Sequence, residues 1–536
     1  MPRSELLLRI VGCTDMSTET GSSPRPRLVL AAATLANAMV LVDQTAVPLT
    51  LPAIMQHYDV GSQLVQWVLN ASLVSLAALL VFGGQLGDLL GRRRVFVVGT
   101  IVFAAASACA AVAPTFYLLV LCRAIQGAGG AAMLPATVAL VSAAFTGGQR
   151  GIALGTMGGI AAVAGAAGPV IGGVLTGVFG WPAVFLVNVP LAAVAVVVAF
   201  VAIPPDTAPA QHARIDLAGA GLLAIMITAF IVGLTQSQNL SWTSPIVWGF
   251  LSLAIAAGGV FIVVERRRAQ PLVDLQLFGK SPNYRTAVIS QGLAGSAEMG
   301  LGVILPLLLI LSFGMSPGVA GLALLPASLP LIAIAPLVGR WYDRAGARPP
   351  MFTGYALLAV GGVLLALGGF SFHYWFVLPG LLAYGAGLAV VLTVNDPVSI
   401  SDVSDADQGQ AAGVSATAEQ FGGALGIAVL YLIFHSTYVA QLHAIIDRGP
   451  LADLTDAEYA RLRADIVAAE TTGLKPKLFD PLLSPYLLAA RTAAAWGYAA
   501  AFIGVTLLGI AGVVLALTAS RFKNKDVSEP SLDTDQ

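Results

Sequence analysis

The chain has 536 residues, of which 57% are hydrophobic and only 10% are Asp, Glu, Lys or Arg, and its formal net charge is −1. A soluble globular protein carries about a quarter of its residues as charged side chains, so this charged fraction cannot cover a surface that faces water. The small net charge gives no electrostatic basis for binding nucleic acid. The composition therefore predicts a protein whose main solvent is membrane lipid and which has no nucleic-acid partner.

The apolar runs predict an all-α membrane protein. A helix needs about 20 mostly apolar residues to cross the hydrocarbon core, and dividing the runs at polar residues, Pro and Gly gives about 14 transmembrane helices. Their approximate ranges are 28–51, 63–85, 95–113, 115–138, 151–179, 183–202, 215–236, 243–264, 286–313, 317–338, 351–370, 375–397, 410–434 and 493–519. Because residues 286–338 form a nearly continuous apolar stretch, a count two higher or lower is the alternative.

The positive charges test this layout. Of the 27 Lys and Arg residues, twenty lie in tails or loops that alternate to one side, and the short loops on the other side carry none. Arg123 lies inside a span, and six more lie in the long segment 435–492. Since Lys and Arg near the ends of spans mark the cytoplasm, we expect both termini to be cytoplasmic. The predicted location is the cell (plasma or inner) membrane.

An internal repeat divides the chain. The loop 84–93 after the second span and the loop 339–348 after the tenth share glycine, aspartate, glycine and arginine at an offset of 255. Repeated halves of this kind form transporters that rock around a central site. The predicted divisions are a cytoplasmic tail 1–27, a six-helix half 28–202, a linker 203–285 with two extra spans, a six-helix half 286–519 and a cytoplasmic tail 520–536. The second half includes a long external loop, 435–492, in which we expect an amphipathic helix.

Several short motifs carry a family resemblance. The loop 84–94 resembles the signature loop of the major facilitator superfamily, G-x-L-x-D-x-x-G-R-R/K. Other segments are similar to motifs of the fourteen-span drug:proton antiporters in that superfamily. These segments are Leu41–Thr45, Leu51–Pro52, Trp67–Leu69, Arg123 with Gln126, Gly127 and Gly129, Gly168–Pro169 with Gly172 and Gly173, and Trp181 with Phe185–Pro190. The resemblance implies proton-coupled export by alternating access, and it links the fourth-span Arg123 to proton coupling.

Charged residues inside spans are costly and therefore mark functional candidates. Such residues are Asp43, Arg123, Glu298 and Glu419, with Asp396 near the end of a span. Burial favours the neutral form of a carboxyl group and a nearby cation favours the charged form, so a carboxyl that changes environment can carry a proton. Asp43 with Arg123 is the predicted proton-coupling pair of the first half. A buried structural ion pair is the alternative.

Glu298 lies near the middle of its predicted span. Small neighbours, among them Gly295 and Gly300, are expected to leave room for a water-filled cavity in which Glu298 binds a proton or an organic cation. Glu419 and Asp396 are weaker candidates for the same role. The alternative for each is a carboxyl group satisfied by a neighbouring helix.

The two repeated loops predict a gate. Asp88 at the end of a span can pair with basic groups or with a helix N-terminus, and such a contact can hold one conformation. The gating candidates are Gly84, Asp88, Gly91, Arg92, Asp343 and Arg344. In the fifth span, the glycines at 168, 172 and 173 are expected to admit a neighbouring helix closely, and Pro169 to bend the helix. Gln126 and Gly127 complete the fourth-span motif.

Other classes of activity lack a sequence signal. The chain has no GxxxxGK[ST] loop for phosphate, no metal-ligand spacing and no catalytic constellation, so we predict no enzyme activity, cofactor or metal. The predicted function is proton-coupled efflux of drugs or antibiotics, with a small amphipathic or cationic substrate, protons and lipid as partners and a monomer as the working unit. An exporter of a secreted metabolite and a nutrient:proton symporter are the alternatives, and a membrane enzyme or sensor is disfavoured.

Overall fold

The computed structural model describes residues 25–145, 148–206, 216–240, 242–268, 271–273, 275–403, 408–446 and 484–518. The regular structure in these ranges is helical. The N-terminal elements are α2 (Pro26–Ala46), η1 (Val47–Thr50), α3 (Leu51–Tyr58), α4 (Ser62–Val65), α5 (Trp67–Leu90), α6 (Arg92–Ala111), α7 (Phe116–Ala144), α8 (Gly148–Phe179), α9 (Pro182–Leu186) and α10 (Asn188–Ala202). The extra pair is α11 (Leu217–Leu240) and α12 (Pro245–Arg267), followed by α13 (Leu275–Lys280). The C-terminal elements are α14 (Pro282–Leu307), η2 (Leu308–Ser312), α15 (Pro317–Ala323), α16 (Leu325–Ala333), α17 (Ala335–Ala345), α18 (Arg348–Gly369), α19 (Tyr374–Ile400), α20 (Gln408–Ile446) and α22 (Ser484–Thr518).

Thirteen helical segments in the described ranges are long and apolar enough to cross a membrane. The missing predicted span, 317–338, is present but is divided into α15, α16 and α17, so the expectation of one continuous helix there is wrong. A proline lacks a backbone N–H and its ring clashes with the preceding turn. The prolines of this segment are Pro317, Pro326, Pro330 and Pro336. With this broken span included, the fold is an all-α membrane protein of about fourteen spans.

The last two long helices differ from their predicted lengths. α20 continues to Ile446, twelve residues beyond the predicted end of its span, and α22 begins at Ser484 instead of 493. The external loop predicted for 435–492 is therefore partly helix at both its ends. The amphipathic helix expected within it, like most of the two tails and Arg214, lies outside the described residues.

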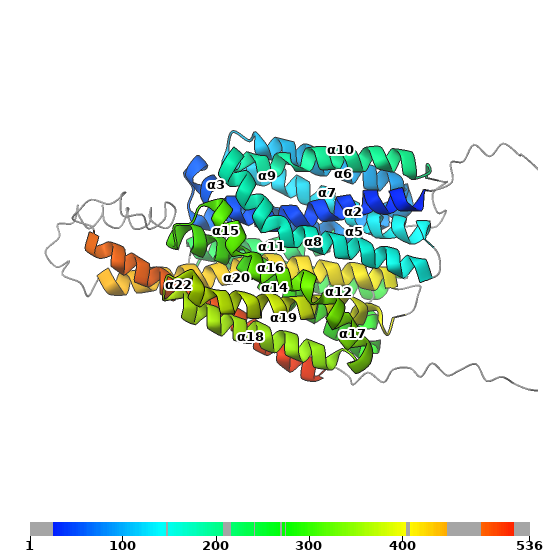
Figure 1. The fold of residues 1–536 in the computed structure, drawn as a ribbon. Coiled ribbons are helices and arrows are strands. Elements are labelled where there is room, and N and C mark those ends of the chain that lie inside the picture. Colours follow the sequence, from blue (N-terminus) through cyan, green and yellow to red (C-terminus); the bar gives the residue numbers. More distant parts are fainter. Residues whose placement is uncertain are drawn as a thin grey trace, which may run out of the picture.

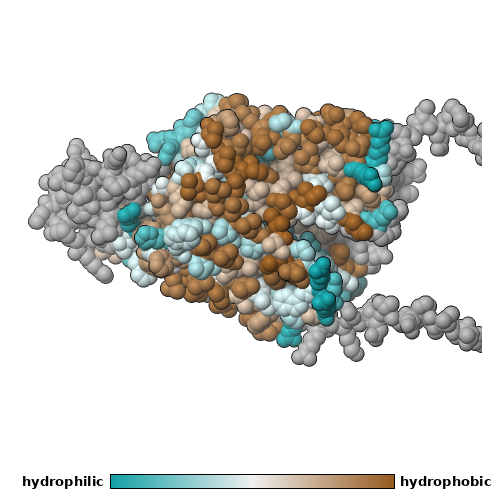
Figure 2. All heavy atoms as spheres, in the orientation of Figure 1, coloured by the Kyte–Doolittle hydropathy of each residue, from teal (hydrophilic) through white to brown (hydrophobic). Residues whose placement is uncertain are grey.

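The helices form two groups with the extra pair against them. In Figure 1, α2 to α10 lie in the upper part of the view, and most of α14 to α22 lies in the lower part, while α15 lies against α8. α11 contacts α5 of the first group and α20 of the second. Figure 2 shows apolar side chains over the middle of the visible face and hydrophilic ones toward its ends. This distribution fits a bundle with lipid around its middle.

The two ends of the bundle differ in charge. We call the end where α2 begins and α22 ends the basic end (Figure 1), and the other end the opposite end. The helix termini at the basic end carry Arg92, Arg93, Arg94, Arg340, Arg344 and Arg348. The first and last described helices thus have their outer termini at one end, as an even number of spans requires.

The sequence repeat is also a repeat of backbone conformation. Gly91 ends α5 with a φ of +100°, and Gly346 ends α17 with a φ of +74°. Glycine adopts this left-handed region without the steric penalty that other residues meet. The offset of 255 therefore relates two helix ends of the same design, one in each half.

α8 forms one of the two seams between the halves, and its contacts with the second half lie toward the opposite end. A side chain at Gly172 would collide with the backbone of Ala46 on α2, and one at Gly173 with Pro317 on α15. Nearer the basic end, a side-chain carbon at Gly155 or Gly159 would meet no other part of the chain within 4 Å. α8 packs against α15 and α16 of the second half but has few or no contacts with α17, which reaches the basic end. The seam between α8 and the second half is therefore tight at the opposite end and looser at the basic end.

The other seam lies between α5 and α20, and these two helices stay in contact closer to the basic end than α8 does with the second half. Ala416 on α20 packs against a small cluster that contains Leu76 and Leu80 on α5. α11 also contacts both of these helices. The halves are thus joined along one side of the molecule and held less closely at the basic end of the other side.

The packing of α8 predicts a difference between two matched substitutions. We expect Gly172→Ala to lower the thermal midpoint of the purified protein, because overpacking of a tight contact costs about 1–3 kcal/mol. Gly155→Ala adds the same methyl group where nothing lies within 4 Å, so its midpoint should equal or slightly exceed that of the unmodified protein. Equal midpoints for both variants, measured in the same detergent, would contradict this account of α8.

Candidate functional site

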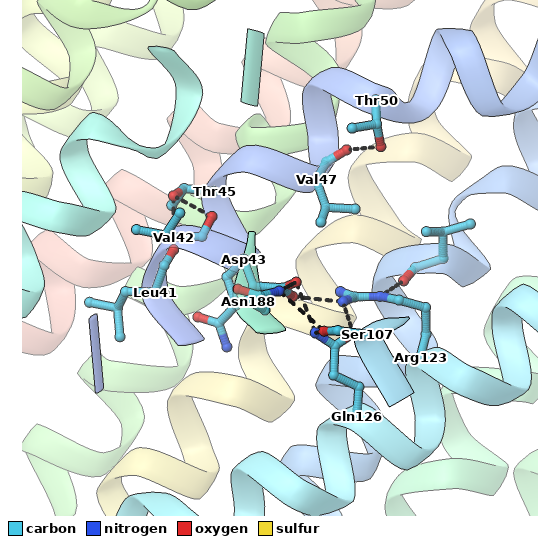
Figure 3. A network of polar contacts seen from close by, with 12 residues as sticks. Leu41, Val42, Asp43, Thr45, Val47, Thr50, Ser107, Arg123, Gln126 and Asn188 are labelled. Carbon is cyan, nitrogen blue, oxygen red and sulfur yellow. Dashed lines mark hydrogen bonds and ion pairs between the residues drawn. The ribbon is translucent and has the colours of Figure 1, made fainter. Parts of the chain in front are cut away.

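Asp43 and Arg123 form a buried ion pair in the first half (Figure 3). Asp43 lies on α2 and Arg123 on α7, and their side chains are 2% and 1% exposed. Arg123 Nη1 is 2.6 Å from Asp43 Oδ2, and Arg123 Nε donates to the carbonyl of Val68 on α5 at 2.7 Å. The structure therefore brings together the two residues that the sequence predicted as a proton-coupling pair.

Three uncharged residues complete the network around Asp43. Gln126 Nε2 donates to Asp43 Oδ1 at 2.9 Å and to Ser107 Oγ at 2.7 Å, and Gln126 Oε1 accepts from Arg123 at 2.5 Å. Asn188 Nδ2, at the start of α10, donates to Asp43 Oδ1 at 3.1 Å and to Ser107 Oγ at 3.2 Å. The Asp43 carboxylate thus receives hydrogen bonds from three side chains on two other helices.

This network pairs the buried Asp43 carboxylate and supplies it with hydrogen bonds. A carboxylate in a low-dielectric interior is costly unless it is paired and hydrogen-bonded, and here both requirements are met. The ring of Phe185 adds a cation–π contact, with its centroid 5.6 Å from the guanidinium carbon of Arg123. Sequence reasoning did not assign Ser107 or Asn188 to the site. Ser107 offered only a polar side chain in an apolar run, which is too common to be selective, whereas Asn188 lies in the motif Phe185–Pro190 that resembles the antiporter family.

The second half holds carboxyl groups without a cationic partner. Gln291 on α14 donates to Glu419 Oε2 on α20 at 2.5 Å. The carboxyl of Glu419 also lies close enough to those of Glu298 and Asp396 to interact electrostatically. The ion pairs found among the described residues are Arg123–Asp43, Arg92–Asp88 and Arg268–Asp216. None of them includes Glu298, Asp396 or Glu419.

Small residues near Glu298 serve helix packing, which corrects the expected cavity beside them. A side chain at Gly295 would collide with the carbonyl of Glu419, and one at Gly300 with α20 at Gly426. One turn beyond Glu298 on its own face, however, a side-chain carbon at Gly302 would meet nothing within 4 Å. Glu298 is itself half-buried, so it borders open space on that face while the other glycines hold α14 against α20.

Asn395 and Asp396 are adjacent in α19, but the first side chain is buried and the second is exposed. Asn395 is fully buried and accepts from Ser290 Oγ on α14 at 2.6 Å. Asp396 is exposed, four residues before α19 ends at the basic end of the bundle. Its carboxyl therefore faces an accessible region and still interacts with Glu419, deeper in the bundle.

One hydrogen bond joins the two sets of charged residues. Gln44 Nε2 on α2 donates to Gln420 Oε1 on α20 at 2.9 Å. Gln44 follows Asp43 in the chain and Gln420 follows Glu419. The paired carboxylate of the first half and the unpaired carboxyls of the second are thus connected through adjacent residues across the seam.

The gating candidates lie at the basic end but do not form a latch between the halves in this conformation. Asp88 pairs with Arg92 of its own loop at 3.2 Å, and both side chains are about half exposed. Gly84 lies next to Pro135 of α7. In the second loop, Asp343 and Arg344 are exposed and belong to none of the ion pairs found in the described residues.

Asp206 supports the first loop and was missed by the sequence analysis. Its two carboxylate oxygens accept from the backbone N–H groups of Arg93 and Arg94, each at 3.0 Å. These groups open α6, where a carboxylate is favoured by the helix dipole. A side chain at Gly91 would collide with Asp206. The glycine is thus required both by its φ and by this close approach, which joins residues more than a hundred positions apart.

The remaining motif residues pack helices together. A side chain at Gly127 would collide with the carbonyl of Ser72 on α5, and one at Gly168 with Thr45 on α2. The carbonyl of Pro169 lies against Gly321 on α15. Among the described residues, no group of three His, Cys, Asp or Glu side chains could hold a metal ion.

Comparisons with known proteins agree with this architecture. The multidrug resistance protein Stp of Mycobacterium tuberculosis is 30% identical over 425 residues, covering 79% of this chain and 78% of that protein. The tetracenomycin C resistance and export protein of Streptomyces glaucescens is 33% identical over 439 residues, covering 78% of this chain and 80% of that protein. A solved bacterial homologue of the human lysosomal transporter Spinster, in an inward-facing and occupied conformation, shares the fold. Its TM-score is 0.66 at 15% identity, over 94% of this chain and 98% of that one.

A family model described as Major Facilitator Superfamily matches residues 33–427. This match spans more than half of the chain, and the relatives at 30% identity or more cover over two thirds of it. The chain belongs to the major facilitator superfamily.

Proposed function

We propose that this protein exports small amphipathic or cationic drugs or antibiotics in exchange for protons. The observation that carries this proposal is that the acidic residues of the two halves are neutralised unequally. Asp43 is paired with Arg123, whereas Glu298, Glu419 and Asp396 have no cationic partner among the described residues. Carboxyl groups in such a setting bind a proton or an organic cation in competition, which is the requirement for exchange.

The proposed cycle follows from the looser end of the α8 seam. Positive charge marks the cytoplasmic side, so the basic end faces the cytoplasm, and the described conformation is looser there. A cationic substrate entering there meets Glu298 and Glu419 and displaces their protons into the cytoplasm. After the halves rock, protons from outside compete with the substrate and release it. The Asp43–Arg123 pair responds to these changes through the Gln44–Gln420 hydrogen bond.

Names of relatives support export over uptake. Stp is named a multidrug resistance protein, and the Streptomyces relative a resistance and export protein. The second name leaves the export of a secreted metabolite as an alternative function. The site would bind and exchange such a metabolite for protons in the same way as a drug. The tight contacts of Gly172 and Gly173 belong to the motif that resembles that of antiporters, and they favour exchange over symport.

One experiment tests the proposed function as a whole. Inverted vesicles that contain the protein are loaded with an impermeant pH dye and given an acidic interior. Adding a lipophilic cation such as tetraphenylphosphonium, or candidate antibiotics, should dissipate the gradient through the unmodified protein. Dissipation that is equal in vesicles without the protein would reject proton-coupled export of that compound.

The buried ion pair predicts separable effects on stability and transport. Arg123→Leu leaves the Asp43 carboxylate buried without a cation, so we expect a loss of about 3–5 kcal/mol of stability and no transport. The double variant Asp43→Leu, Arg123→Leu removes both charges and should recover most of the thermal midpoint while transport stays absent. Arg123→Lys keeps the charge but loses the forked geometry and should transport more slowly. If the double variant transports at the unmodified rate, the pair has only a structural role.

The unpaired carboxyls predict proton release on substrate binding. Adding tetraphenylphosphonium to the purified protein in weakly buffered detergent should release protons, because the cation displaces them from Glu298 and Glu419. We expect Glu298→Gln to reduce the release at least several-fold and Glu419→Gln to reduce it as well. Asp59→Asn is the matched control, since Asp59 is exposed at the opposite end and its variant should release protons normally. Equal release from Glu298→Gln and the control would remove Glu298 from the site.

A further inference from the structure

The extra pair α11–α12 ends at the basic end in a buried group of two acids that the transport site does not use. Asp216 precedes α11 and Glu265 lies in the last turn of α12, and each is only 3% exposed. Asp216 Oδ1 accepts from the backbone N–H of Gly219 at 2.8 Å and is 3.3 Å from Arg268 Nη2. Glu265 Oε2 accepts from the backbone N–H of Val273 at 3.0 Å. One oxygen of each acid is thus satisfied.

The second oxygens of both acids converge on one point without a partner. Asp216 Oδ2 and Glu265 Oε1 are buried and make no hydrogen bond within the part of the chain that the structure describes. These same two atoms are the ones that a side-chain carbon at Gly219 would strike. Two carboxylates that face the same buried point disfavour each other's ionised form. A proton between the two oxygens would satisfy both of them.

Few charged groups surround this acid pair. Among the described residues, the charges that act on Glu265 are those of Asp216 and Arg268, and the Arg268 side chain is 44% exposed. The packed elements otherwise offer the neutral side chains of Gln85 and Gln410 and the backbone of 271–273. On α13, Lys280 is exposed and bonded to Gln276. One half-exposed cation therefore faces two buried acids.

The acid pair also lies in a chain of contacts that joins the halves. Gln85, on α5 in the first half, accepts from the backbone N–H of Asp216 at 3.2 Å. Gln410, on α20 in the second half, donates to the carbonyls of Pro271 and Leu272, each at 2.9 Å. The two acids lie between these contacts, because Glu265 binds the segment 271–273 and Asp216 binds Gln85. We call this chain the seam clamp: Gln85, Asp216, Glu265, Arg268, 271–273 and Gln410.

We propose that Asp216 and Glu265 share one proton and that this proton site closes the seam clamp, which holds α5 against α20 at the basic end. With the proton bound, Glu265 donates to Asp216 and the remaining negative charge is balanced by Arg268. When the proton leaves to solvent, two carboxylates face one another with a single cation nearby. Their repulsion separates the extra pair from its contacts, and the α5–α20 seam loosens at the end that carries the signature loop.

The inserted helices thereby acquire a role in the transport cycle that differs from substrate binding. The looser seam at α8 and the clamped seam at α5 and α20 lie on different sides of the molecule. A clamp on one side makes that side the hinge, so that opening at the basic end is confined to the α8 side. The proposal depends on the geometry of the extra pair and not on the identity of the exported compound.

Distances across the clamp test the proposal directly. Spin labels at Leu90 on α5 and Ala412 on α20, both exposed, report the width of the seam by pulsed electron paramagnetic resonance. Glu298→Gln and Glu419→Gln are included in every sample to remove their titration. We expect one short-distance population at acidic pH and a shift to longer distances as the pH rises. Glu265→Gln, a neutral donor in place of the acid, should keep the short distance at every pH.

Two further variants distinguish loss of the seam clamp from a non-specific loosening of helix packing at the basic end. Gln410→Leu breaks the contact with 271–273 and should shift the population to longer distances at every pH. Gln276→Leu removes a glutamine at the same end that bonds Lys280 outside the clamp, and it should behave like the unmodified protein. A distance that does not change with pH, or a Glu265→Gln variant that responds as the unmodified protein does, overturns the proposal.

A second measurement detects the proton itself. Difference infrared spectra recorded between acidic and alkaline pH should contain the carbonyl band of a protonated carboxyl, and Glu265→Gln should lose that band. If Glu265→Gln fails to fold, Asp216→Asn replaces it and should keep Glu265 protonated to higher pH. Absence of any band that depends on Glu265 or Asp216 overturns the shared proton. Neither the distance measurement nor the infrared measurement depends on transport. A negative result in either one therefore rejects the shared proton without testing the proposed export.

Discussion

The pairing of Arg123 with Asp43 is the interaction around which the first half is built. A bilayer offers no water to a buried charge, so a guanidinium in the middle of a helix must find its partners within the protein. Arg123 does so with a carboxylate on α2, a backbone carbonyl on α5 and an amide one turn along its own helix. Ser107 and Asn188 bring α6 and α10 into the same network. Five helices are thereby fixed relative to one another around a neutral pair.

The second half distributes its charge differently, and this contrast gives the molecule its proposed chemistry. Glu419 interacts with Glu298 and Asp396, and none of the three pairs with a cation among the described residues. A rigid, neutralised centre therefore faces a group of acids whose charge depends on what they bind. The Gln44–Gln420 hydrogen bond lies between them, next to one member of each set. Changes of charge in one half can reach the other half through this contact.

Close helix packing determines which parts of the molecule can move when the charge of these acids changes. Glycines on α8 hold it against α2 and α15 at the opposite end. Nearer the basic end, Ala153 and Met157 of α8 still pack against Ala33 of α2, but a side-chain carbon at Gly155 would meet nothing within 4 Å. On the other side, α5 and α20 stay together under α11 and the seam clamp. In the described conformation the halves are therefore joined on one side and held less closely at the basic end of the other. The extra pair, which a twelve-span bundle lacks, belongs to the joined side.

The sequence alone determined the membrane class, the approximate spans, the repeat and the charged candidates, because hydropathy, charge bias and isolated buried charges are local signals. The pairing of Arg123 with Asp43 was also within its reach, since few buried charges compete for one partner. Only the tertiary structure decided the roles of Asn188, Asp206, Asp216 and Glu265, because each role depends on contacts with other helices or loops that the packing brings together. It also replaced the expected cavity at Gly295 with a helix contact. A small residue permits either open space or a close neighbour, and which of the two occurs depends on the packing of the whole bundle.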